Sequence, residues 1–437
     1  MFATKLQGAS LFLLICRDLQ GSDAFRKRGP ERATHRCVPV SVPDGAEESS
    51  NCGPGSGIIP LRPSLGRHGG RCPRTRLSRE TQWFEQGAPM SSIAIAQPAS
   101  PKPAASPYAE LKRRVEAAGL MRKRPGYYSL MLVTNTLLFA TCFAVLALTK
   151  NVWWTILAAA VLGFVSGQLG FQLHDSGHRQ MFSSRRLNTI VGIVTGDGLL
   201  GMSHGWWVDK HNKHHGNPNH QDLDPDIGVG VIAYSREQAL AKSGMSRWVV
   251  RHQAQLFFPL LFGLGWAMHK SSVAFLVKAR GGQRWVEIGT LCLHLVAYVA
   301  LLVALVGPWR AALVIVVQKC VGGFYMASVF APNHKGMPQI EPGEEMDFLR
   351  SQVLTARNVR SHPMTDFLYG CLNYQIEHHL FPTMPRCNIR EAHKIVRAYC
   401  ADLGVPYHET SIYRSYREIL EFLHEVGAPL RKAAVPV

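Results

Sequence analysis

Four long apolar runs constrain this chain more than any other feature of its sequence. Each is almost free of charge and close to the length of about 20 residues that a helix needs to cross roughly 30 Å of hydrocarbon. Inside a bilayer every backbone polar group must find a partner within the segment, so such runs fold as helices. The sequence therefore predicts an all-α membrane protein with four transmembrane helices at 127–149, 152–171, 285–306 and 311–331.

The spacing of these runs predicts two helical hairpins. Only Lys150 and Asn151 separate the first two runs, and residues 307–310 separate the last two. Connections this short place consecutive helices antiparallel and side by side. Two further apolar segments, 190–202 and 256–268, are too short or too broken to be full spans. We expect them at the membrane interface or partly inserted.

The distribution of positive charge predicts the orientation of the hairpins. The net charge is +18, but the chain has no zinc-finger spacing, RNA-binding signature or basic heptad region, so no nucleic-acid partner is indicated. Lys and Arg are enriched in cytoplasmic segments of membrane proteins. Here the hairpin tips carry almost none, and residues 108–124 predict a basic amphipathic helix at the membrane surface. We therefore expect a cytoplasmic helical cap that contains Lys112, Arg113, Arg114, Arg122, Lys123, Arg124, Arg179, Arg185, Arg186, Lys335, Arg350, Arg357 and Arg360.

The two ends of the chain differ in composition from its centre. Residues 1–107 are rich in Arg, Gly, Pro and Ser without periodicity, which is typical of a disordered N-terminal extension. Met90 opens a stretch that resembles an ordinary flexible N-terminus, which suggests the hypothesis that residues 1–89 are a start-site artefact. We expect the membrane domain at 108–425 and a flexible C-terminal tail at 426–437.

Three short motifs rich in histidine follow the membrane spans. They read HDSGH at 174–178, HNKHH at 211–215 and QIEHH at 375–379. Spacings of three and four residues put imidazoles on one face of a helix, aimed at one point. The predicted hairpins bring all three motifs to the same, cytoplasmic side. Because neutral imidazole binds zinc, copper, iron and nickel, the motifs predict a metal site there.

The number of histidines indicates two metal ions. One zinc ion takes about four ligands, which is fewer than the motifs supply. The zinc-protease signature H-E-x-x-H is absent from the sequence. The Glu-x-x-His pattern of soluble di-iron bundles occurs once, at Glu421 and His424, where we interpret it as a surface pair. A histidine-rich pair of irons remains, with redox chemistry that zinc lacks.

Together the three motifs resemble those of the membrane fatty acid desaturases, over residues 108–425. Supporting context is WW at 206–207, DPDI at 224–227 and NYQIEHHLFPTMPR at 373–386. Gln375 stands where many relatives have histidine, an exchange that resembles the front-end, acyl-lipid branch. The sequence lacks the His-Pro-Gly-Gly signature of the haem domain fused to many eukaryotic relatives. The resemblance is therefore to a bacterial type without that domain, and it implies a location in the bacterial inner membrane.

This resemblance implies a reaction and its partners. The expected activity is O2-dependent introduction of a cis double bond into an acyl chain, with front-end regiochemistry of the delta-6, linoleoyl type. The expected cofactors are two Fe ions, with O2 as co-substrate. Electrons would come from a separate ferredoxin or other reductase system. The acyl chain would arrive as an acyl-CoA or within a lipid.

The same resemblance implies roles for individual residues, and no catalytic group is expected beyond the metal ligands. The ligands that match the family are His174, His178, His211, His214, His215, His334, His378 and His379. The residues interpreted as hydrogen-bond partners of these ligands, or as a weak ligand, are Gln375, Asp175, His204, His220 and Asp224. Trp206 and Trp207 are candidates for the wall of a substrate tunnel or for anchors at the membrane interface.

Two other functions stay open at this point. A lipid or carotenoid hydroxylase or ketolase of the same superfamily would use the same ligands, but its product would carry oxygen instead of a new double bond. A metal transporter would also need histidines. Transporters hold their ligands within spans near the membrane midplane. The motifs here lie at the ends of spans and in loops, which disfavours transport.

Overall fold

The computed structural model describes residues 106–228 and 230–432, all within one compact unit. Residues 1–105 of the expected disordered extension and the proposed start at Met90 lie outside these residues, whereas Ser106 and Pro107 are described and begin a helix. The described part is built almost entirely of helices, with a single pair of two-residue strands. This arrangement confirms the predicted all-α class.

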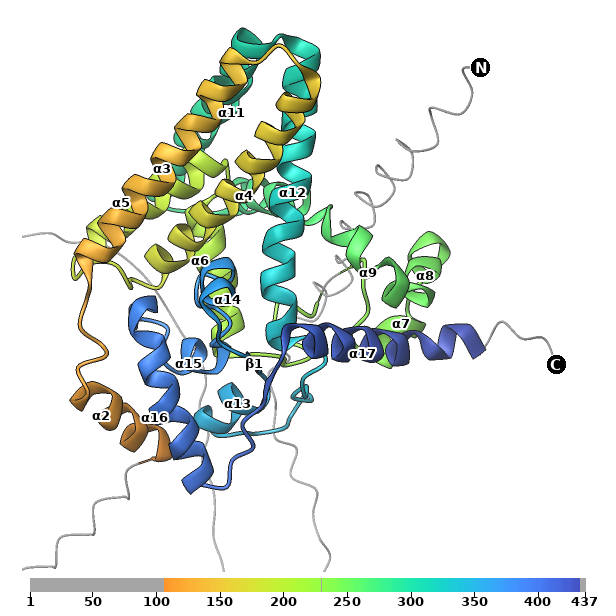
Figure 1. The fold of residues 1–437 in the computed structure, drawn as a ribbon. Coiled ribbons are helices and arrows are strands. Elements are labelled where there is room, and N and C mark those ends of the chain that lie inside the picture. The colour runs from red at the N-terminus through yellow and green to blue at the C-terminus, as the bar shows by residue number, and fades with distance from the viewer. Residues whose placement is uncertain (1–105, 229, 433–437) are drawn as a thin grey trace, which may run out of the picture. The chain divides into compact units, whose positions relative to one another are not determined.

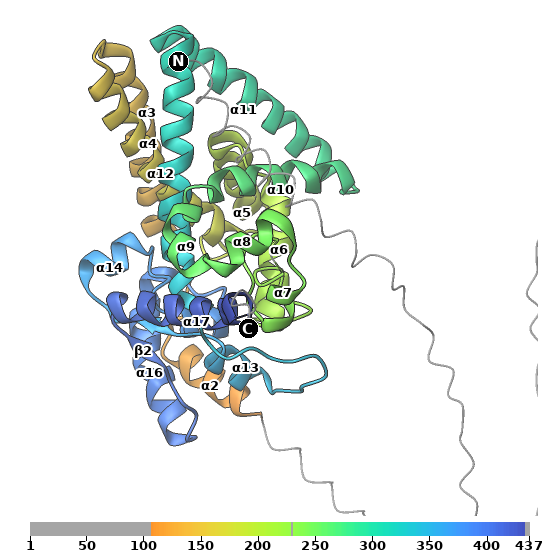
Figure 2. The same ribbon diagram turned by 90° about the vertical axis from the view of Figure 1, so that its right-hand side faces the viewer.

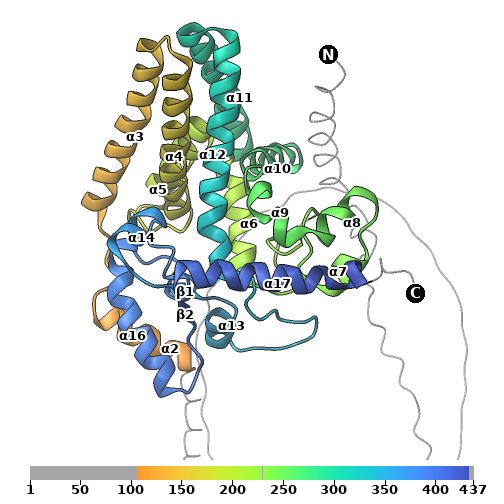
Figure 3. The ribbon, with the colours of Figure 1, turned by 45° about the vertical axis from the view of Figure 1, so that its right-hand side comes forward.

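Four helices within the described residues are long and apolar enough to span a membrane. They pair as two hairpins whose tips lie at the same end of the bundle (Figures 1 and 3). The sequence prediction of four spans in two hairpins is therefore confirmed. Their bounds are α3 Pro125–Leu148, α4 Val152–Gly177, α11 Gln283–Val306 and α12 Pro308–His334.

Local sequence explains why each hairpin turns so sharply. The side chain of Asn151 accepts a hydrogen bond from the backbone N–H of Trp153 at 2.8 Å and so caps the start of α4. In the second hairpin, Gly307 has a φ of 76°, a conformation that glycine adopts without the steric penalty of a side chain. Pro308 then opens α12 with a φ already suited to the first helical turn.

Glycines let α4 and α12 pack closely along their length. A Cβ added to Gly163 would lie 2.9 Å from the backbone oxygen of Gln318, and one added to Gly322 would lie 3.2 Å from the backbone oxygen of Gly163. Small residues at such contacts allow two membrane helices to approach backbone to backbone. As a result the final turns of α4 and α12, which carry His174 and His334, lie close together at the same end of the bundle.

The segment between the hairpins contains short helices that lie beside the bundle (Figure 2). One of them is a π-helix, a rare form that tends to occur at functional sites. The pair α9 and α10 is bent by 72° at its break, which makes it a candidate broken span or re-entrant loop, as the apolar segment 256–268 suggested. The bounds are α5 Arg185–Ile193, η2 Val194–Leu200, α6 His204–Gly216, α7 Arg236–Leu240, α8 Gly244–Arg251, α9 Gln253–Leu261 and α10 Leu264–Lys278.

A helical cap covers the end of the bundle opposite the hairpin tips (Figures 1 and 3). Strands β1 and β2 pair in parallel, with Asn358 opposite Glu409 and Val359 opposite Thr410. Helix α17 runs across the end of the long helices (Figure 3). The elements of the cap are α2 Pro107–Ala117, α13 Phe348–Leu354, β1 Asn358–Val359, α14 Pro363–Leu368, α15 Gln375–Leu380, η3 Arg386–Asn388, α16 Ile389–Asp402, β2 Glu409–Thr410 and α17 Ile412–Lys432.

Two details of the cap differ from the sequence-based expectations. Helix α2 ends at Ala117, before Gly119 with its φ of 71°, and so is shorter than the helix expected at 108–124. Its apolar residues Leu111 and Val115 are fully buried in a core formed with α13, α15 and α16, so this face serves the cap. Helix α17 continues to Lys432, into the segment where a flexible tail was expected.

Candidate metal centre

The eight expected ligands lie together where the bundle meets the cap. His174 and His178 come from the end of α4, and His334 is the last residue of α12. Helix α6 supplies the histidines of the second motif, and α15 supplies those of the third. Segments far apart in sequence therefore converge, and the side chains fall into two groups.

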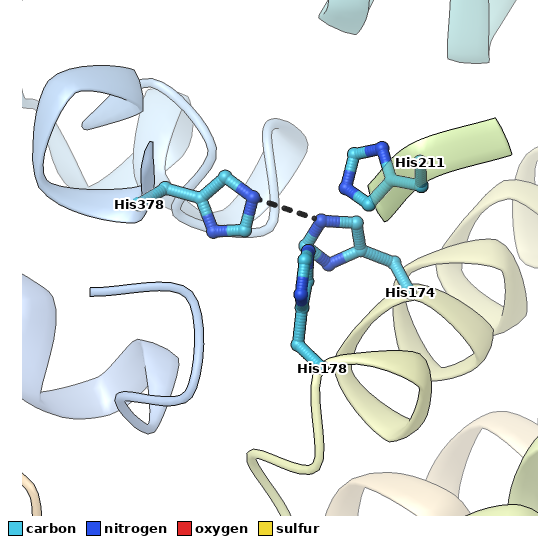
Figure 4. Close-up of side chains that lie close together, drawn as sticks. All are labelled: His174, His178, His211 and His378. Atoms are coloured by element: carbon cyan, nitrogen blue, oxygen red, sulfur yellow. Dashed lines mark hydrogen bonds between the residues drawn. The ribbon is translucent and has the colours of Figure 1, made fainter. Parts of the chain in front are cut away.

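The first group surrounds one point with histidines from three motifs (Figure 4). His174, His178, His211 and His378 each offer a ring nitrogen, and these nitrogens all lie within 4.8 Å of one another. The Nε2 atoms of His174 and His378 are 3.2 Å apart. His215 joins this group, because its Nε2 lies 3.0 Å from Nε2 of His378 and 3.2 Å from Nε2 of His211.

The second group is smaller and lies beside the first. His214, His334 and His379 offer nitrogens within 4.8 Å of one another. The Nε2 atom of His334 is 3.2 Å from that of His214 and 3.0 Å from that of His379. The side-chain amide of Gln375 also reaches this point, with its nitrogen 3.0 Å from Nε2 of His334. Three imidazoles and one amide thus converge here.

Hydrogen bonds at the outer nitrogens fix the tautomers of four of these rings. Nδ1 of His334 lies 3.0 Å from the backbone oxygen of Thr355, which can only accept, so Nδ1 carries the proton. Nδ1 of His379 donates in the same way to Oε1 of Gln352 at 2.8 Å. The equivalent acceptors for His174 and His214 are the carboxylates of Asp175, at 3.0 Å, and Asp224, at 2.9 Å. In each ring the proton therefore faces outward and the lone pair on Nε2 faces the centre of the group.

These inward lone pairs fit a bound cation. Two unprotonated nitrogens about 3 Å apart repel each other unless something positive lies between them. A metal–nitrogen bond of about 2.1 Å would place two ligands at right angles roughly 3.0 Å apart, close to the separations found here. In addition, Nε2 of His178 is buried and has no hydrogen-bond partner. The donor set and its spacing therefore suit one metal ion in each group.

The surroundings keep the imidazoles neutral, as metal binding requires. Burial lowers the pKa of His211, His215 and His378 well below the ordinary value of 6.5, and the neighbouring histidines lower it further. The pKa of His379 is lowered by the same two causes. A neutral ring offers a lone pair, whereas an imidazolium offers none.

The carboxylates behind the ligands are themselves held in place. Asp175 forms a buried ion pair with Arg386, a residue of the cap. Asp224 accepts hydrogen bonds from the backbone N–H groups of Asn219 and Asp226, both at 2.8 Å. Such outer contacts orient ligand rings and raise their basicity. Sequence reasoning had singled out the two aspartates but not Arg386 or Asn219.

Comparison with known proteins identifies the family of this chain. The family model for fatty acid desaturases matches residues 151–411, which contain all three histidine motifs. The chain is 32% identical to an acyl-lipid (9-3)-desaturase of Physcomitrium patens over 313 residues, 69% of this chain and 59% of that protein. It is 30% identical to the Delta(6)-fatty-acid desaturase fat-3 of Caenorhabditis elegans over 349 residues, 75% of this chain and 76% of the relative. The chain belongs to the fatty acid desaturase family.

The name of a third relative states a different position for the double bond. The Delta(5) fatty acid desaturase fat-4 of Caenorhabditis elegans is 28% identical over 343 residues, 74% of this chain and 75% of that protein. Because the match covers less than two thirds of the Physcomitrium patens relative, it does not extend over that whole protein. The family is one of oxidoreductases, and membership gives no support to the alternative of a metal transporter.

Two histidines considered from the sequence lie apart from the ligand groups of this desaturase. The ring of His204 is buried at the start of α6, and neither of its nitrogens has a hydrogen-bond partner among the described residues. The ring of His220 accepts a hydrogen bond from the backbone of Asp222 at 3.3 Å. Within the described residues, we find no hydrogen bond from either ring to a ligand.

The two tryptophans occupy different positions near an apolar cavity. The ring of Trp207 stacks on His211, with centroids 4.7 Å apart, and also lines the cavity. Trp206 is equally buried and packs against Trp207 but is not part of the lining. The cavity runs from Trp207 and Phe330, beside the histidines, along α4, α10 and α12 to Gln318. Five glycines of these helices leave room in its wall: Gly167, Gly170, Gly265, Gly322 and Gly323.

Proposed function

We propose that this chain is a membrane-bound acyl-chain desaturase that uses two histidine-bound irons and O2 to form a cis double bond, with front-end regiochemistry of the delta-6 type. One observation carries the proposal. Eight imidazoles form two adjacent groups, and rings of both groups have their outer nitrogens anchored and their inner nitrogens 3.0–3.2 Å apart. The names of the relatives, which include delta-6 and delta-5 desaturases, support the substrate class.

Each iron would have its own set of ligands. His174, His178, His211, His215 and His378 would hold the first iron. His214, His334 and His379 would hold the second, with Gln375 beside them. When bound, the irons would supply the activation of O2 that removal of hydrogen from an unactivated methylene pair requires. The reaction balances when O2, two electrons, two protons and the two hydrogens of the chain give two waters and the alkene.

The amide of Gln375 would complete the second set. Its oxygen accepts a hydrogen bond from the amide nitrogen of Asn333 at 2.8 Å. If both side-chain amides are flipped by 180°, the nitrogen of Gln375 donates to the oxygen of Asn333, and the oxygen of Gln375 faces the centre of the group. An amide oxygen is a neutral acceptor and so a weaker donor to a metal than imidazole. Gln375 would therefore shape the second site and help to set which carbons approach it.

The apolar cavity would hold the part of the acyl chain beyond the new double bond. One end of it is lined by Trp207 and Phe330, which stand four residues before the ligands His211 and His334, and the ring of Trp207 stacks on His211. Most of the side chains that line this path are apolar, Trp207 among them. A saturated stretch of chain is stabilised there by the transfer of its apolar surface out of water.

The setting of the enzyme follows from the charge pattern. The basic segments of the cap support a location on the cytoplasmic side, by the positive-inside rule. The acyl-CoA or acyl-lipid substrate and a separate ferredoxin or other reductase would approach from that side. We assign the chain to a bacterial inner membrane on the resemblance described above.

Lipid analysis tests the proposal directly. The full chain would be expressed in a host that lacks the activity, and acyl products would be analysed by mass spectrometry with localisation of double bonds. We expect a new cis double bond on the carboxyl side of an existing one. His214→Ala should abolish it, whereas His220→Ala, which changes a histidine outside both groups, should retain activity. A hydroxylated or oxo product, or full activity of His214→Ala, would overturn the proposal.

A further inference from the structure

Three buried titratable side chains lie together outside the two ligand groups. They are Asp197 of the π-helix η2, His204 at the start of α6 and Glu287 near the start of α11, and each is more than nine-tenths buried. Oδ1 of Asp197 and both ring nitrogens of His204 have no hydrogen-bond partner among the described residues. Buried polar atoms of this kind are usually satisfied by ordered water. The three side chains therefore mark a path for water inside the protein.

The outer end of this path is one hydrogen bond from the protein surface. The carboxylate of Glu287 accepts from the side-chain amide of the exposed Gln283 at 2.8 Å. Its other oxygen accepts from the hydroxyl of Ser203 at 2.6 Å. The next residue, His204, donates its backbone N–H to Oδ2 of Asp197 at 3.1 Å. Polar contacts thus connect the surface at Gln283 with Asp197 and His204.

The inner end of the path lies against the helix that carries the first motif. A Cβ added to Gly192 would lie 2.5 Å from Nε2 of His204 and 2.9 Å from the hydroxyl oxygen of Ser176. These two atoms are therefore at most 5.4 Å apart, the sum of the two distances, which one water molecule can bridge with two hydrogen bonds. Ser176 lies on α4 between the ligands His174 and His178.

Helix α6 provides a second connection from His204 to the ligands. Positions 204, 207 and 211 are separated by three and four residues, so they follow one face of the helix. Nε1 of Trp207 is also buried without a hydrogen-bond partner among the described residues, and its ring stacks on the ligand His211. An indole N–H can only donate, so it would hold a water molecule between His204 and the first ligand group.

The surroundings give Asp197 and His204 complementary protonation states. Burial, followed by the negative charge of Glu287, raises the pKa of the Asp197 carboxyl from 3.8 to about 8. Burial lowers the pKa of His204 below its ordinary value of 6.5. At neutral pH Asp197 therefore holds a proton, and the neutral ring of His204 has a lone pair that can receive one. The neighbouring Ser176 of α4 and Ser272 of α10 carry no charge.

We propose that Glu287, Asp197 and His204 form a relay that carries protons from the surface at Gln283 to the metal centre. This inference rests on the proposed function, which consumes two protons for each alkene formed. In each transfer Asp197 gives its proton through water to the free ring nitrogen of His204, and the other ring nitrogen releases a proton towards Ser176. A proton taken up from solvent at Glu287 then restores Asp197. The relay ends each transfer with the number of protons that it held before.

The first test observes the proton on Asp197 in resting, iron-loaded protein without substrate, so it needs no turnover. Infrared spectroscopy detects the carbonyl stretch of a protonated carboxyl group, and this band shifts in D2O when the proton exchanges. We expect a band at neutral pH that is lost in Asp197→Asn. Glu287→Gln should keep the band but exchange it more slowly. Glu345→Gln changes an exposed carboxylate and should exchange like the wild type.

The second test asks whether the relay serves the reaction. Asp197→Asn should lower kcat by roughly 100-fold, the lower end of the contribution of a positioned acid or base. KM and iron content should be unchanged, because Asp197 contacts no ligand. The rate in H2O relative to D2O should exceed the wild-type ratio, since proton delivery becomes rate-limiting. Asp197→Glu keeps a proton-carrying group and should recover part of the activity. If Asp197→Asn does not accumulate in the membrane, Glu287→Gln takes its place in this test.

The outcomes separate a relay from a structural role and from the proposed function. Wild-type kcat in Asp197→Asn, or an infrared spectrum without a band that depends on Asp197, would overturn the inference alone. A lower kcat accompanied by lost iron and an unchanged H2O-to-D2O ratio would show that Asp197 only supports the fold, and would overturn it as well. A wild-type protein that forms no alkene would overturn the proposed function and this inference with it.

Discussion

Replacing Asp224 by Asn should weaken the second metal group selectively. Both carboxylate oxygens of Asp224 lie close to Nδ1 of His214, at 2.9 and 3.0 Å, and each also accepts a backbone N–H, from Asn219 or Asp226. Asn keeps the shape but has one acceptor where Asp has two, so one buried N–H would face an NH2 group. The ring of His214 would then be held less firmly. Loss of such an outer contact lowers metal affinity by about 10- to 100-fold, which corresponds to roughly 1.4–2.8 kcal/mol.

Asp226→Asn is the matched control. The carboxylate of Asp226 lies 3.6 Å from Nδ1 of His214, too far for a hydrogen bond, and pairs instead with Lys210. Iron bound per chain would be measured by elemental analysis after equilibration over a series of buffered iron concentrations. At limiting iron we expect about half the wild-type iron in Asp224→Asn, with activity lost in proportion, and wild-type values in Asp226→Asn. Equal iron affinity in Asp224→Asn and wild type would refute the assigned role of Asp224.

Four further variants test other parts of the structure. Gln375→Ala should retain iron, since all eight histidines remain, but should impair turnover. Gln375→His should keep the iron and alter the rate or the double-bond position. Wild-type rate and regiochemistry in both variants would show that Gln375 only packs beside the site. A chain starting at Met90 should insert and desaturate like the full chain, as measured by membrane fractionation and lipid analysis, and inactivity would show a role for the preceding residues. Gly163→Val should lower the melting temperature of the purified protein by several degrees, because the new Cβ would lie 2.9 Å from the backbone oxygen of Gln318. An unchanged melting temperature would contradict the close packing of α4 on α12.

The spans and hairpins could be predicted from sequence because one physical requirement dominates them. A run of apolar residues must form a helix in hydrocarbon, and short connections leave only antiparallel neighbours. The cap was harder to predict. The apolar stripe of Leu111 and Val115 indicates that one face of α2 is buried, but the pattern is the same whether membrane or protein covers it. Gly427 and Pro429 favour a helix end, yet helix α17 continues through both. Its last turns are stabilised because Leu430 packs against residues of α7 and α8.

In the metal centre too, the local sequence reveals some of the residues and the fold alone reveals the others. The three motifs reveal the histidines through their spacing, and Asp175 and Asp224 stand out because they lie within or near a motif. Gln352 and Thr355 could not be found in this way. They come from a segment with no signature, and Thr355 contributes a backbone oxygen, which every residue type has. Only the fold shows that β1 and α13 bring this segment behind the ligand rings.

The metal content of the purified protein tests the central claim most directly. Full-length protein from iron-replete cells would be analysed for iron and zinc against protein concentration determined by amino-acid analysis. Two groups of inward-facing nitrogens predict close to two irons per chain and little zinc. One metal ion per chain, or zinc in place of iron under these conditions, would contradict the account.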